Sequence, residues 1–278
     1  MDRSHSAIDS YERDRLRSFG MRDTLEALEA GEITVSEAES RLAGYATTAA
    51  GRFDADRERR RGVPEAILAE GKTPTEVGRL ATTALETTDR ALVTRATDTD
   101  VEAVREAVSA ADPDVTVDHD PRTRTIVIHG DEFDLPTLDA GVAVVTAGTS
   151  DAPAAGEAAT VAREIGAEVD VIADVGVASL VRLLDQLDRI READVVVVAA
   201  GREGALPTVV AGLVSAPVIA LPVSTGYGAG GDGEAALYGS LQSCTVLTVV
   251  NVDAGFVAGA QAGLIARAID DAAASVDG

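Results

Sequence analysis

From residue 141 onward, five apolar segments alternate with five segments of helical pattern. The apolar segments are rich in Val, Ile and Ala, as in the run Val195 to Ala200. Strands that are apolar throughout are typical of a parallel sheet covered by helices on both faces. We therefore predict a doubly wound α/β domain with a five-stranded parallel sheet. The predicted strands are 141–147, 168–173, 194–200, 217–221 and 245–250, and the predicted helices are 153–166, 178–192, 204–214, 231–243 and 255–270.

The residues before this domain have a different pattern. Apolar positions between 10 and 50 recur at helical spacing, with a break at Gly31 and an end near Gly44, whereas 51–72 are highly charged and less periodic. A helix over 75–87, followed by strand, helix, strand and strand over 91–130, predicts a small α+β unit. The predicted organisation is a helical segment over 1–50, an α+β domain over 51–138 and the α/β domain over 139–278.

The composition excludes several classes of partner. The net charge is −23, from 47 acidic and 24 basic residues, and Lys72 is the one lysine. Such a chain repels nucleic acid and anionic membranes, and its acidic residues, spread along the chain, indicate a halophilic surface. No apolar run approaches the ~20 residues that span a bilayer. Because residues 1–20 also lack the apolar segment of a secretory signal, we predict a cytoplasmic protein.

The candidate site lies in the loops that follow the predicted strands, because open α/β sheets bind ligands beyond the carboxyl ends of their strands. The first loop, Ala-Gly-Thr-Ser-Asp, leads into a helix near Pro153. Unpaired N–H groups and the helix dipole favour an anion there, so we predict a ligand that carries phosphate. The candidate residues are Gly148, Thr149, Ser150, Asp151, Asp174, Gly201, Glu203, Gly204, Ser224, Gly226, Tyr227 and Asp253.

The acidic residues of these loops have two interpretations. Asp151, Asp174, Glu203 and Asp253 offer the oxygen ligands that a divalent cation such as Mg²⁺ prefers. The alternative is that each carboxylate caps a helix, which is strongest for Asp151 and Asp253. The glycine spacing matches neither the dinucleotide fingerprint nor the Walker loop.

Cys244 is the sole cysteine, which excludes an intramolecular disulfide and a cysteine-cluster metal site. A lone cysteine is most often an inert core residue. Cys244 precedes the last predicted strand, so it lies at the amino edge of the sheet, opposite the loops described above. A catalytic role would therefore need a neighbouring subunit, or a fold-back of the glycine-rich 224–233 loop.

These motifs resemble a known pair of families. Ala-Gly-Thr-Ser-Asp with Pro153, the 200–207 segment and the 217–222 segment are similar to PurE-type aminoimidazole ribonucleotide (AIR) carboxylases. The closer resemblance is to LarB, a PurE-related family of nickel-pincer cofactor synthesis, and it extends over about 50–270. It implies a flavodoxin-like fold. The residues that carry it are Asp174-Val-Gly-Val-Ala, Glu203-Gly-Ala-Leu, Ser224-Thr-Gly-Tyr-Gly, Ser243-Cys244, Asn251-Val-Asp-Ala-Gly-Phe, the charged 54–65 segment and Gly71-Lys72-Thr-Pro.

One position separates the two families. PurE carboxylases carry a catalytic His in the loop that corresponds to 200–207, and here the matching residue is Ala205. Cys244 stands where LarB proteins place their essential cysteine. The resemblance to LarB implies carboxylation of nicotinic acid adenine dinucleotide at the pyridinium C5, with CO₂ or bicarbonate as co-substrate. It also implies hydrolysis of the phosphoanhydride, giving pyridinium-3,5-biscarboxylic acid mononucleotide and AMP.

The resemblance also implies roles for individual residues. The Cys244 thiolate adds to the ring, and Glu203, or else Asp151, removes the C5 proton. Arg57 and Arg60, with the loop amides, hold the diphosphate. Mg²⁺ on Asp174 and Glu203 assists its cleavage. The family further implies a high-order homo-oligomer, such as an octamer, whose sites are shared between subunits.

Two alternatives stay open at this point. One is a PurE-like carboxylase or mutase that acts on a phosphoribosyl substrate, against which Ala205 argues. The other is a non-catalytic nucleotide-binding module, which predicts that Cys244→Ser leaves function intact.

Overall fold

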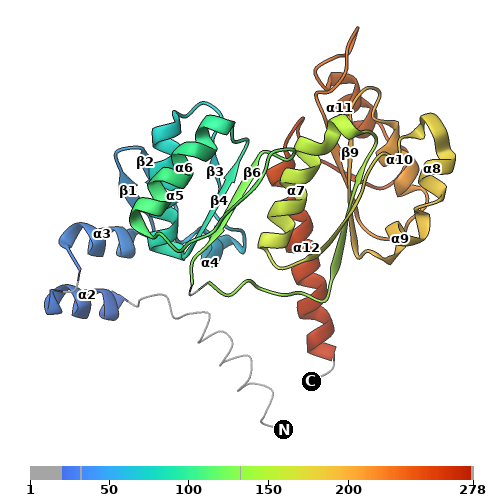
Figure 1. Cartoon of the computed structure of the whole chain (residues 1–278). Helices are drawn as coiled ribbons and strands as arrows, with labels where there is room; N and C mark the ends of the chain where they lie inside the picture. Colours follow the sequence, from blue (N-terminus) through green and yellow to red (C-terminus); the bar gives the residue numbers. More distant parts are fainter. Residues whose placement is uncertain (1–20, 32, 132, 277–278) are drawn as a thin grey trace.

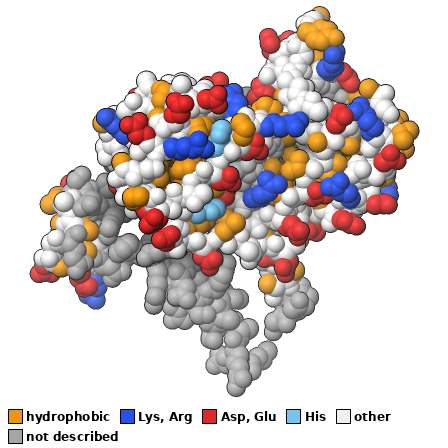
Figure 2. Space-filling view, viewed as in Figure 1, with side chains coloured by type: hydrophobic (Ala, Val, Ile, Leu, Met, Phe, Trp, Pro, Cys, Tyr) orange, Lys and Arg blue, Asp and Glu red, His pale blue; other side chains and the backbone are white. Residues whose placement is uncertain are grey.

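A computed structural model describes residues 21–276 except 32 and 132, so the part of the first predicted helical segment before residue 21 lies outside the described residues. The chain forms two α/β parts that lie side by side (Figure 1). On the face shown in Figure 2, acidic side chains are scattered over both parts, with arginines between them. No helix in the described ranges combines the length and the apolar content needed to cross a membrane.

The carboxyl-terminal part confirms the predicted doubly wound fold. All five strands are parallel, in the order β11-β10-β9-β7-β8. The strand order reverses direction between β7 and β9, the place at which such sheets bind ligands. The strands are β7 (Gly141–Thr146), β8 (Glu168–Ile172), β9 (Val195–Ala200), β10 (Val218–Pro222) and β11 (Thr248–Val249).

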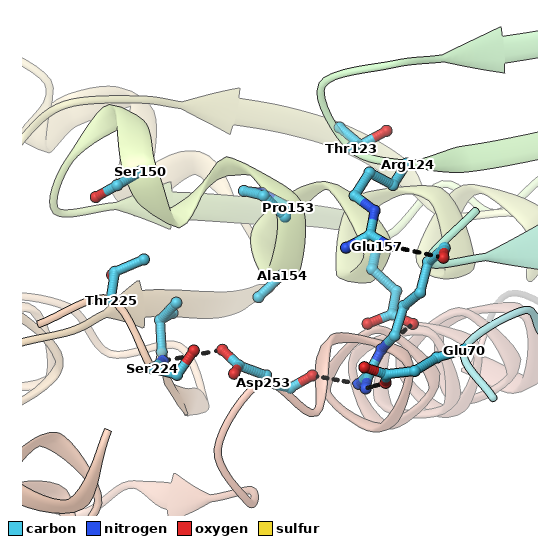
Figure 3. A pocket seen from close by; sticks show the side chains of 12 residues that line it. Glu70, Thr123, Arg124, Ser150, Pro153, Ala154, Glu157, Ser224, Thr225 and Asp253 are labelled. Carbon is cyan, nitrogen blue, oxygen red and sulfur yellow. Dashed lines mark hydrogen bonds and ion pairs between the residues drawn. The ribbon is translucent and has the colours of Figure 1, made fainter. Parts of the chain in front are cut away.

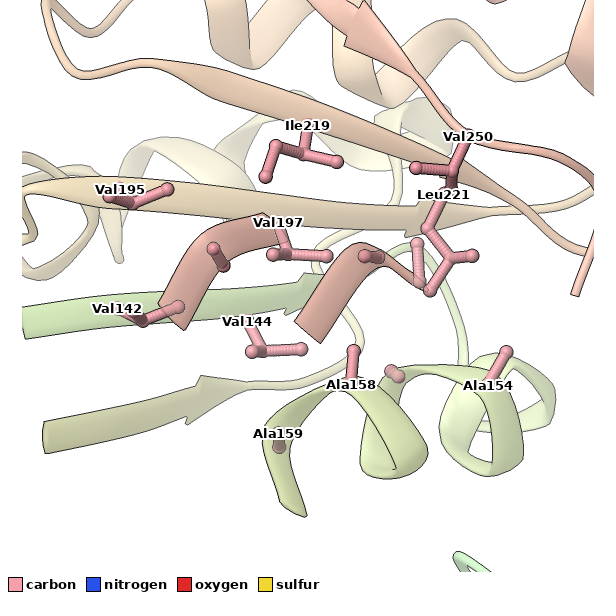
Figure 4. Packing of buried hydrophobic residues seen from close by; sticks show 14 of the residues in the cluster. Val142, Val144, Ala154, Ala158, Ala159, Val195, Val197, Ile219, Leu221 and Val250 are labelled. Carbon is pink, nitrogen blue, oxygen red and sulfur yellow. The ribbon is translucent and has the colours of Figure 1, made fainter. Parts of the chain in front are cut away.

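Helices cover both faces of this sheet. On one face lie α7 (Ala152–Glu164) and α12 (Gly255–Val276), which Figure 4 shows packed on Val144, Val197 and Leu221. On the other lie α8 (Leu180–Leu184), α9 (Leu187–Glu192) and α10 (Ala205–Ala211), with α11 (Glu234–Leu241) beside α10. Successive side chains of a strand point to opposite faces. In β9, Val195, Val197 and Ala199 therefore join one core and Val196, Val198 and Ala200 the other, which explains the continuous apolar runs.

The amino-terminal part is a four-stranded sheet in the order β3-β4-β6-β5, covered on one face by α5 (Pro74–Thr88) and α6 (Asp98–Ala111). Its other face packs on the carboxyl-terminal part, because Leu92 and Val127 join one cluster with Val161 of α7, Ile165 just after it and Ala260 of α12. Helix α7 therefore lies between the two sheets (Figure 1). The strands are β3 (Ile67–Leu68), β4 (Arg90–Thr94), β5 (Val117–Asp120) and β6 (Thr125–His129).

Buried polar contacts hold the two parts together. Arg90, which is 4% exposed, donates from Nη1 to the carbonyl oxygen of Glu164 at 2.8 Å. Arg267 of α12 donates to the carbonyl oxygens of Gly62 and Ile165 at 2.9 and 3.0 Å. Because each bond satisfies a main-chain acceptor at the boundary, the two parts form one packed body.

Three secondary-structure predictions were wrong. The break at Gly31 and the end of the helical pattern near Gly44 are confirmed, because α2 is Met21–Ala30 and α3 is Val35–Ala43. The helical segment was nevertheless expected to extend to residue 50, and the chain instead forms a hairpin of β1 (Ala46–Thr48) and β2 (Gly51–Phe53). A local turn sets the hairpin, because Thr48 Oγ1 accepts from Ala50 N and donates to Gly51 O, both at 3.0 Å.

The other two errors concern a helix and the last strand. The predicted 178–192 helix starts with the 3₁₀ turn η2 (Val177–Ser179) and is divided into α8 and α9. The fifth strand was predicted over six residues and has two. It lies at the edge of the sheet, and Cys244 and Val246, which precede it, are exposed and do not pair with β10. The charged 51–72 segment also contains α4 (Arg57–Arg61) and β3, which lack a periodic signal.

The packing of α12 on α7 gives a stability prediction. A Cβ at Gly259 would lie 2.3 Å from the carbonyl oxygen of Ala158, so no larger side chain fits there. We expect Gly259→Val to lower the free energy of unfolding by about 1–3 kcal/mol in urea titrations, because overpacking forces the helices apart. Ala273→Val, on the exposed end of the same helix, is the matched control. Equal midpoints for the two variants would contradict the close packing.

Candidate functional site

A cavity of about 210 Å³ lies at the carboxyl edge of the larger sheet, at the amino-terminal end of α7. Figure 3 shows Ser150, Ser224, Thr225 and Asp253 on one side of it, and Arg124, Glu157 and Glu70 on the other. The first group comes from the predicted strand-end loops and the second mostly from the amino-terminal part. The lining residues are Glu70, Arg95, Thr123, Arg124, Ser150, Pro153, Ala154, Glu157, Val223, Ser224, Thr225 and Asp253.

Asp151 ties two of these loops together. It is 3% exposed, and its Oδ2 accepts from Gly148 N at 2.8 Å while its Oδ1 accepts from Thr225 Oγ1 at 2.9 Å. Burial raises the pKa of this carboxyl, and the hydrogen bonds lower it by less. Both oxygens are occupied, so Asp151 positions Gly148 and Thr225. The contact with Gly148 agrees with the capping interpretation.

Asp253 joins the last loop to the rest of the site. Its Oδ1 accepts from Ser224 N at 2.9 Å, and its carbonyl oxygen accepts from Arg95 Nη2 at 2.7 Å. Its backbone is left-handed, with φ 54°. Non-glycine residues in this region carry strain that persists where surrounding contacts impose it, often at functional sites.

Sequence reasoning missed the charged wall of the cavity, which consists of Glu70, Arg95, Arg124 and Glu157. Arg95 Nη1 donates to Glu70 Oε2 at 2.9 Å, and its Nε lies 3.6 Å from Glu157 Oε1. Glu157 is 3% exposed, and burial raises its pKa even though a hydrogen bond from Thr94 and the charge of Arg95 lower it. Arg95 directly follows β4, so the rule of ligand binding at strand ends, extended to the smaller sheet, would have found it.

Comparison with known proteins assigns both parts. Residues 45–130 match the LarB/PurE-like N-terminal domain, and residues 141–275 match AIR carboxylase. The chain is also 35% identical, over 256 residues, to the uncharacterized protein MJ0165 of Methanocaldococcus jannaschii, covering 89% of this chain and 97% of that protein. The chain belongs to the LarB family. Its two matched regions correspond to the two sheets, and the cavity of this LarB-family chain lies where they meet.

The prediction that Arg57 and Arg60 bind the substrate diphosphate finds no support in the single chain. Arg57 Nη1 donates to Glu65 Oε2 at 2.8 Å, and its guanidinium lies over the Phe256 ring at 5.4 Å. Arg60 pairs with Asp54 and Asp56. Neither arginine lines the cavity, because α4 directs both toward carboxylates of its own part.

The remaining loop candidates lie outside the cavity lining. Asp174 accepts from Arg182 Nη1 at 2.8 Å, and Glu203 is exposed on the turn between Gly201 and Gly204 that leads into α10. Tyr227, next to Gly226, is 79% exposed, and its ring lies under the Arg202 guanidinium at 4.5 Å. The carbonyl oxygen of Thr149 accepts a hydrogen bond from Arg122 Nη2.

The expected Mg²⁺ site has few protein ligands in the described part of the chain. Among the described residues, no group of three or more His, Cys, Asp or Glu side chains is placed to hold a metal ion. Of the two predicted ligands, Asp174 already pairs with an arginine. Mg²⁺ usually binds through one or two carboxylates together with substrate phosphates, so Mg²⁺ on Asp174 and Glu203 stays a prediction, and we derive no step through it.

Cys244 lies apart from the cavity, at the amino edge that the sequence indicated. It is exposed and precedes β11. Its neighbour Ser243 accepts from Thr208 Oγ1 at 3.0 Å, and Thr245 Oγ1 donates to the Thr208 carbonyl oxygen at 3.4 Å. The segment is therefore held against α10, which runs back from the carboxyl edge toward the amino edge.

The raised pKa of Glu157 gives a pH-dependent prediction. A carboxyl whose pKa is raised by folding stabilises the protein at low pH, and this contribution is lost as the pH rises through the folded-state pKa. Glu157→Gln, which stays neutral, should therefore gain stability relative to the wild type as the pH rises above 4.5, the ordinary pKa of Glu, and through the folded-state pKa. Urea unfolding at several pH values measures the difference, and the acid end of the series is the internal control. A difference that falls as the pH rises would contradict it.

Proposed function

We propose that this protein carboxylates the pyridinium ring of nicotinic acid adenine dinucleotide at C5 and hydrolyses its phosphoanhydride. The products are pyridinium-3,5-biscarboxylic acid mononucleotide and AMP, which supply nickel-pincer cofactor synthesis. Family membership supports a carboxylase-type enzyme. The observation that carries the finer proposal is the exposed Cys244 thiol in a chain that has Ala205 where PurE carboxylases have histidine.

A thiol suits this chemistry because a pyridinium ring is electron-poor and does not attack CO₂. Addition of the Cys244 thiolate forms a C–S bond, removes the positive charge and makes C5 enamine-like. C5 then forms a C–C bond to CO₂, which becomes the new carboxylate. Loss of the C5 proton to a base and cleavage of the C–S bond restore the aromatic cation and the thiolate. Glu203 stays our proposed base, with Asp151 the less favoured because both its oxygens accept hydrogen bonds.

Separation of the thiol from the cavity supports a shared site. Cys244 lies at one edge of the sheet and the cavity at the other. Large apolar side chains are exposed around the cysteine: Tyr238 is 54%, Leu241 61% and Val246 96% exposed. Exposed apolar groups that gather in one region mark contact surfaces. We propose a homo-oligomer in which one copy supplies the thiol and another the cavity, by the closed symmetry usual for soluble oligomers.

The test is direct incubation of the purified protein with nicotinic acid adenine dinucleotide, ¹³C-bicarbonate and Mg²⁺. Mass spectrometry should find a labelled dicarboxylated mononucleotide and AMP in equal amounts. A parallel reaction with aminoimidazole ribonucleotide tests the AIR carboxylase alternative. Turnover of that substrate, with no labelled product from the dinucleotide, would overturn the proposal.

A further inference from the structure

The turn between β5 and β6 reaches from the amino-terminal part over the start of α7. Arg122 Nη2 donates to the carbonyl oxygen of Thr149 at 3.5 Å. A Cβ at Gly156 of α7 would lie 2.0 Å from Thr123 Cγ2 and 2.4 Å from its Cβ, so Thr123 occupies the space that any side chain there would need. Close packing of this kind fixes the position of the turn relative to α7.

The turn presents Arg124 to the cavity in a set orientation. Arg124 Nε donates to the Ala96 carbonyl oxygen at 3.1 Å, and Nη2 donates to that of Arg95 at 2.9 Å. Figure 3 shows the Arg124 side chain at the cavity. Both arginines have left-handed backbones, with φ 58° for Arg124 and 57° for Arg95. Non-glycine residues with this backbone persist where the surrounding structure imposes it, and they gather at active sites and ligand sites.

The two cavity arginines differ in charge balance. Arg95 lies near two carboxylates, Glu70 at 2.9 Å and Glu157 at 3.6 Å. Arg124 contacts two neutral carbonyl oxygens, and within the described part of the chain it forms no ion pair with a carboxylate. In a chain of net charge −23, the Arg124 guanidinium is therefore a positive charge on the cavity that its own contacts leave uncompensated.

We propose that Arg124 binds a phosphate group of the substrate, so that the amino-terminal part completes the site. This inference rests on the proposed function, in which the phosphate belongs to the diphosphate of the dinucleotide. A guanidinium matches phosphate oxygens in a two-pronged geometry. Ser150 and the start of α7 line the same cavity, and the N–H groups of that first turn, to which Pro153 contributes none, favour the same anion. A cavity of about 210 Å³ holds only part of a dinucleotide, so the pyridinium extends out of it toward the thiol of another copy.

The test is isothermal titration of the full-length protein with inorganic pyrophosphate and, separately, with nicotinic acid adenine dinucleotide. Arg124→Ala should weaken both affinities by about tenfold to a hundredfold, because a charge-assisted contact is lost. Arg124→Lys should lose less, since a point charge remains. Gly156→Val should weaken binding too, because it displaces the turn while leaving Arg124 in the sequence. Arg105→Ala, on the exposed side of α6, is the matched control and should bind as the wild type does.

Thermal unfolding is the control for folding. If Arg124→Ala unfolds at the same temperature as the wild type, its loss of affinity is local to the cavity. Wild-type affinity in Arg124→Ala, or a wild-type protein that binds neither ligand, overturns this inference. The experiment distinguishes failure of the proposed phosphate site from failure of the proposed function. If pyrophosphate binding depends on Arg124 but no carboxylated product forms, the phosphate site stands and the proposed function fails. If the product forms and Arg124→Ala binds normally, the reverse holds.

Discussion

Cys244→Ser is expected to bind nicotinic acid adenine dinucleotide with wild-type affinity and to lose carboxylation by at least about a thousandfold. The serine hydroxyl is similar in size, but it is too weak a nucleophile at neutral pH to add to the ring. Because the thiol is exposed and remote from the cavity of its own chain, its loss should leave the contacts of that cavity in place. Titration calorimetry measures binding, and incorporation of labelled bicarbonate measures the reaction.

The control uses the fact that Cys244 is the sole cysteine. Iodoacetamide should inactivate the wild type to the level of Cys244→Ser and leave the variant unchanged. A serine variant that keeps its carboxylation rate would remove the thiol from the mechanism. A serine variant that keeps ligand-linked function, in a protein without any turnover, would favour the non-catalytic nucleotide-binding module.

Mixing two inactive variants is expected to restore activity. Ser224→Trp should fill the cavity while leaving the Ser224 amide bond to Asp253 intact, and it keeps the thiol. Cys244→Ser keeps the cavity and lacks the thiol. If each site combines the cavity of one copy with the thiol of another, random co-assembly should give about a quarter of the sites both functional halves. The expected result is activity rising from background to about a quarter of the wild type in co-expressed protein.

The matched comparison is the same two variants purified separately and mixed at low concentration without exchange of subunits, which should stay inactive. Light scattering on each preparation gives its oligomeric state. A fully active monomer would contradict the shared site, and so would background activity in co-expressed hetero-oligomers of demonstrated mixed composition.

Local sequence was sufficient for the larger sheet. The uninterrupted Val and Ala runs of β7 and β9 exclude half-exposed strands, because residues on both sides of each strand are apolar. Strand order then follows from few choices, since parallel strands need crossover helices of one handedness. The same reasoning located Ser150, Ser224 and Asp253, which lie at strand ends and line the cavity. The same reasoning could not predict hairpin β1–β2 or the short β3, because segments of two or three residues are too short to show a hydrophobic period.

Tertiary structure alone decided which charged residues line the cavity. Arg57 and Arg124 look equivalent in the sequence, but α4 turns Arg57 toward Glu65, whereas the β5–β6 turn places Arg124 at the cavity. The difference arises from packing between segments far apart in the chain. Leu92 of β4 packs against α7 and holds the smaller sheet beside the larger one, and Thr123 packs against Gly156 and fixes the position of the β5–β6 turn. Spacing along a sequence reports one element at a time, so it determined the strands and their loops, while contacts between the two sheets determined the charged wall of the site.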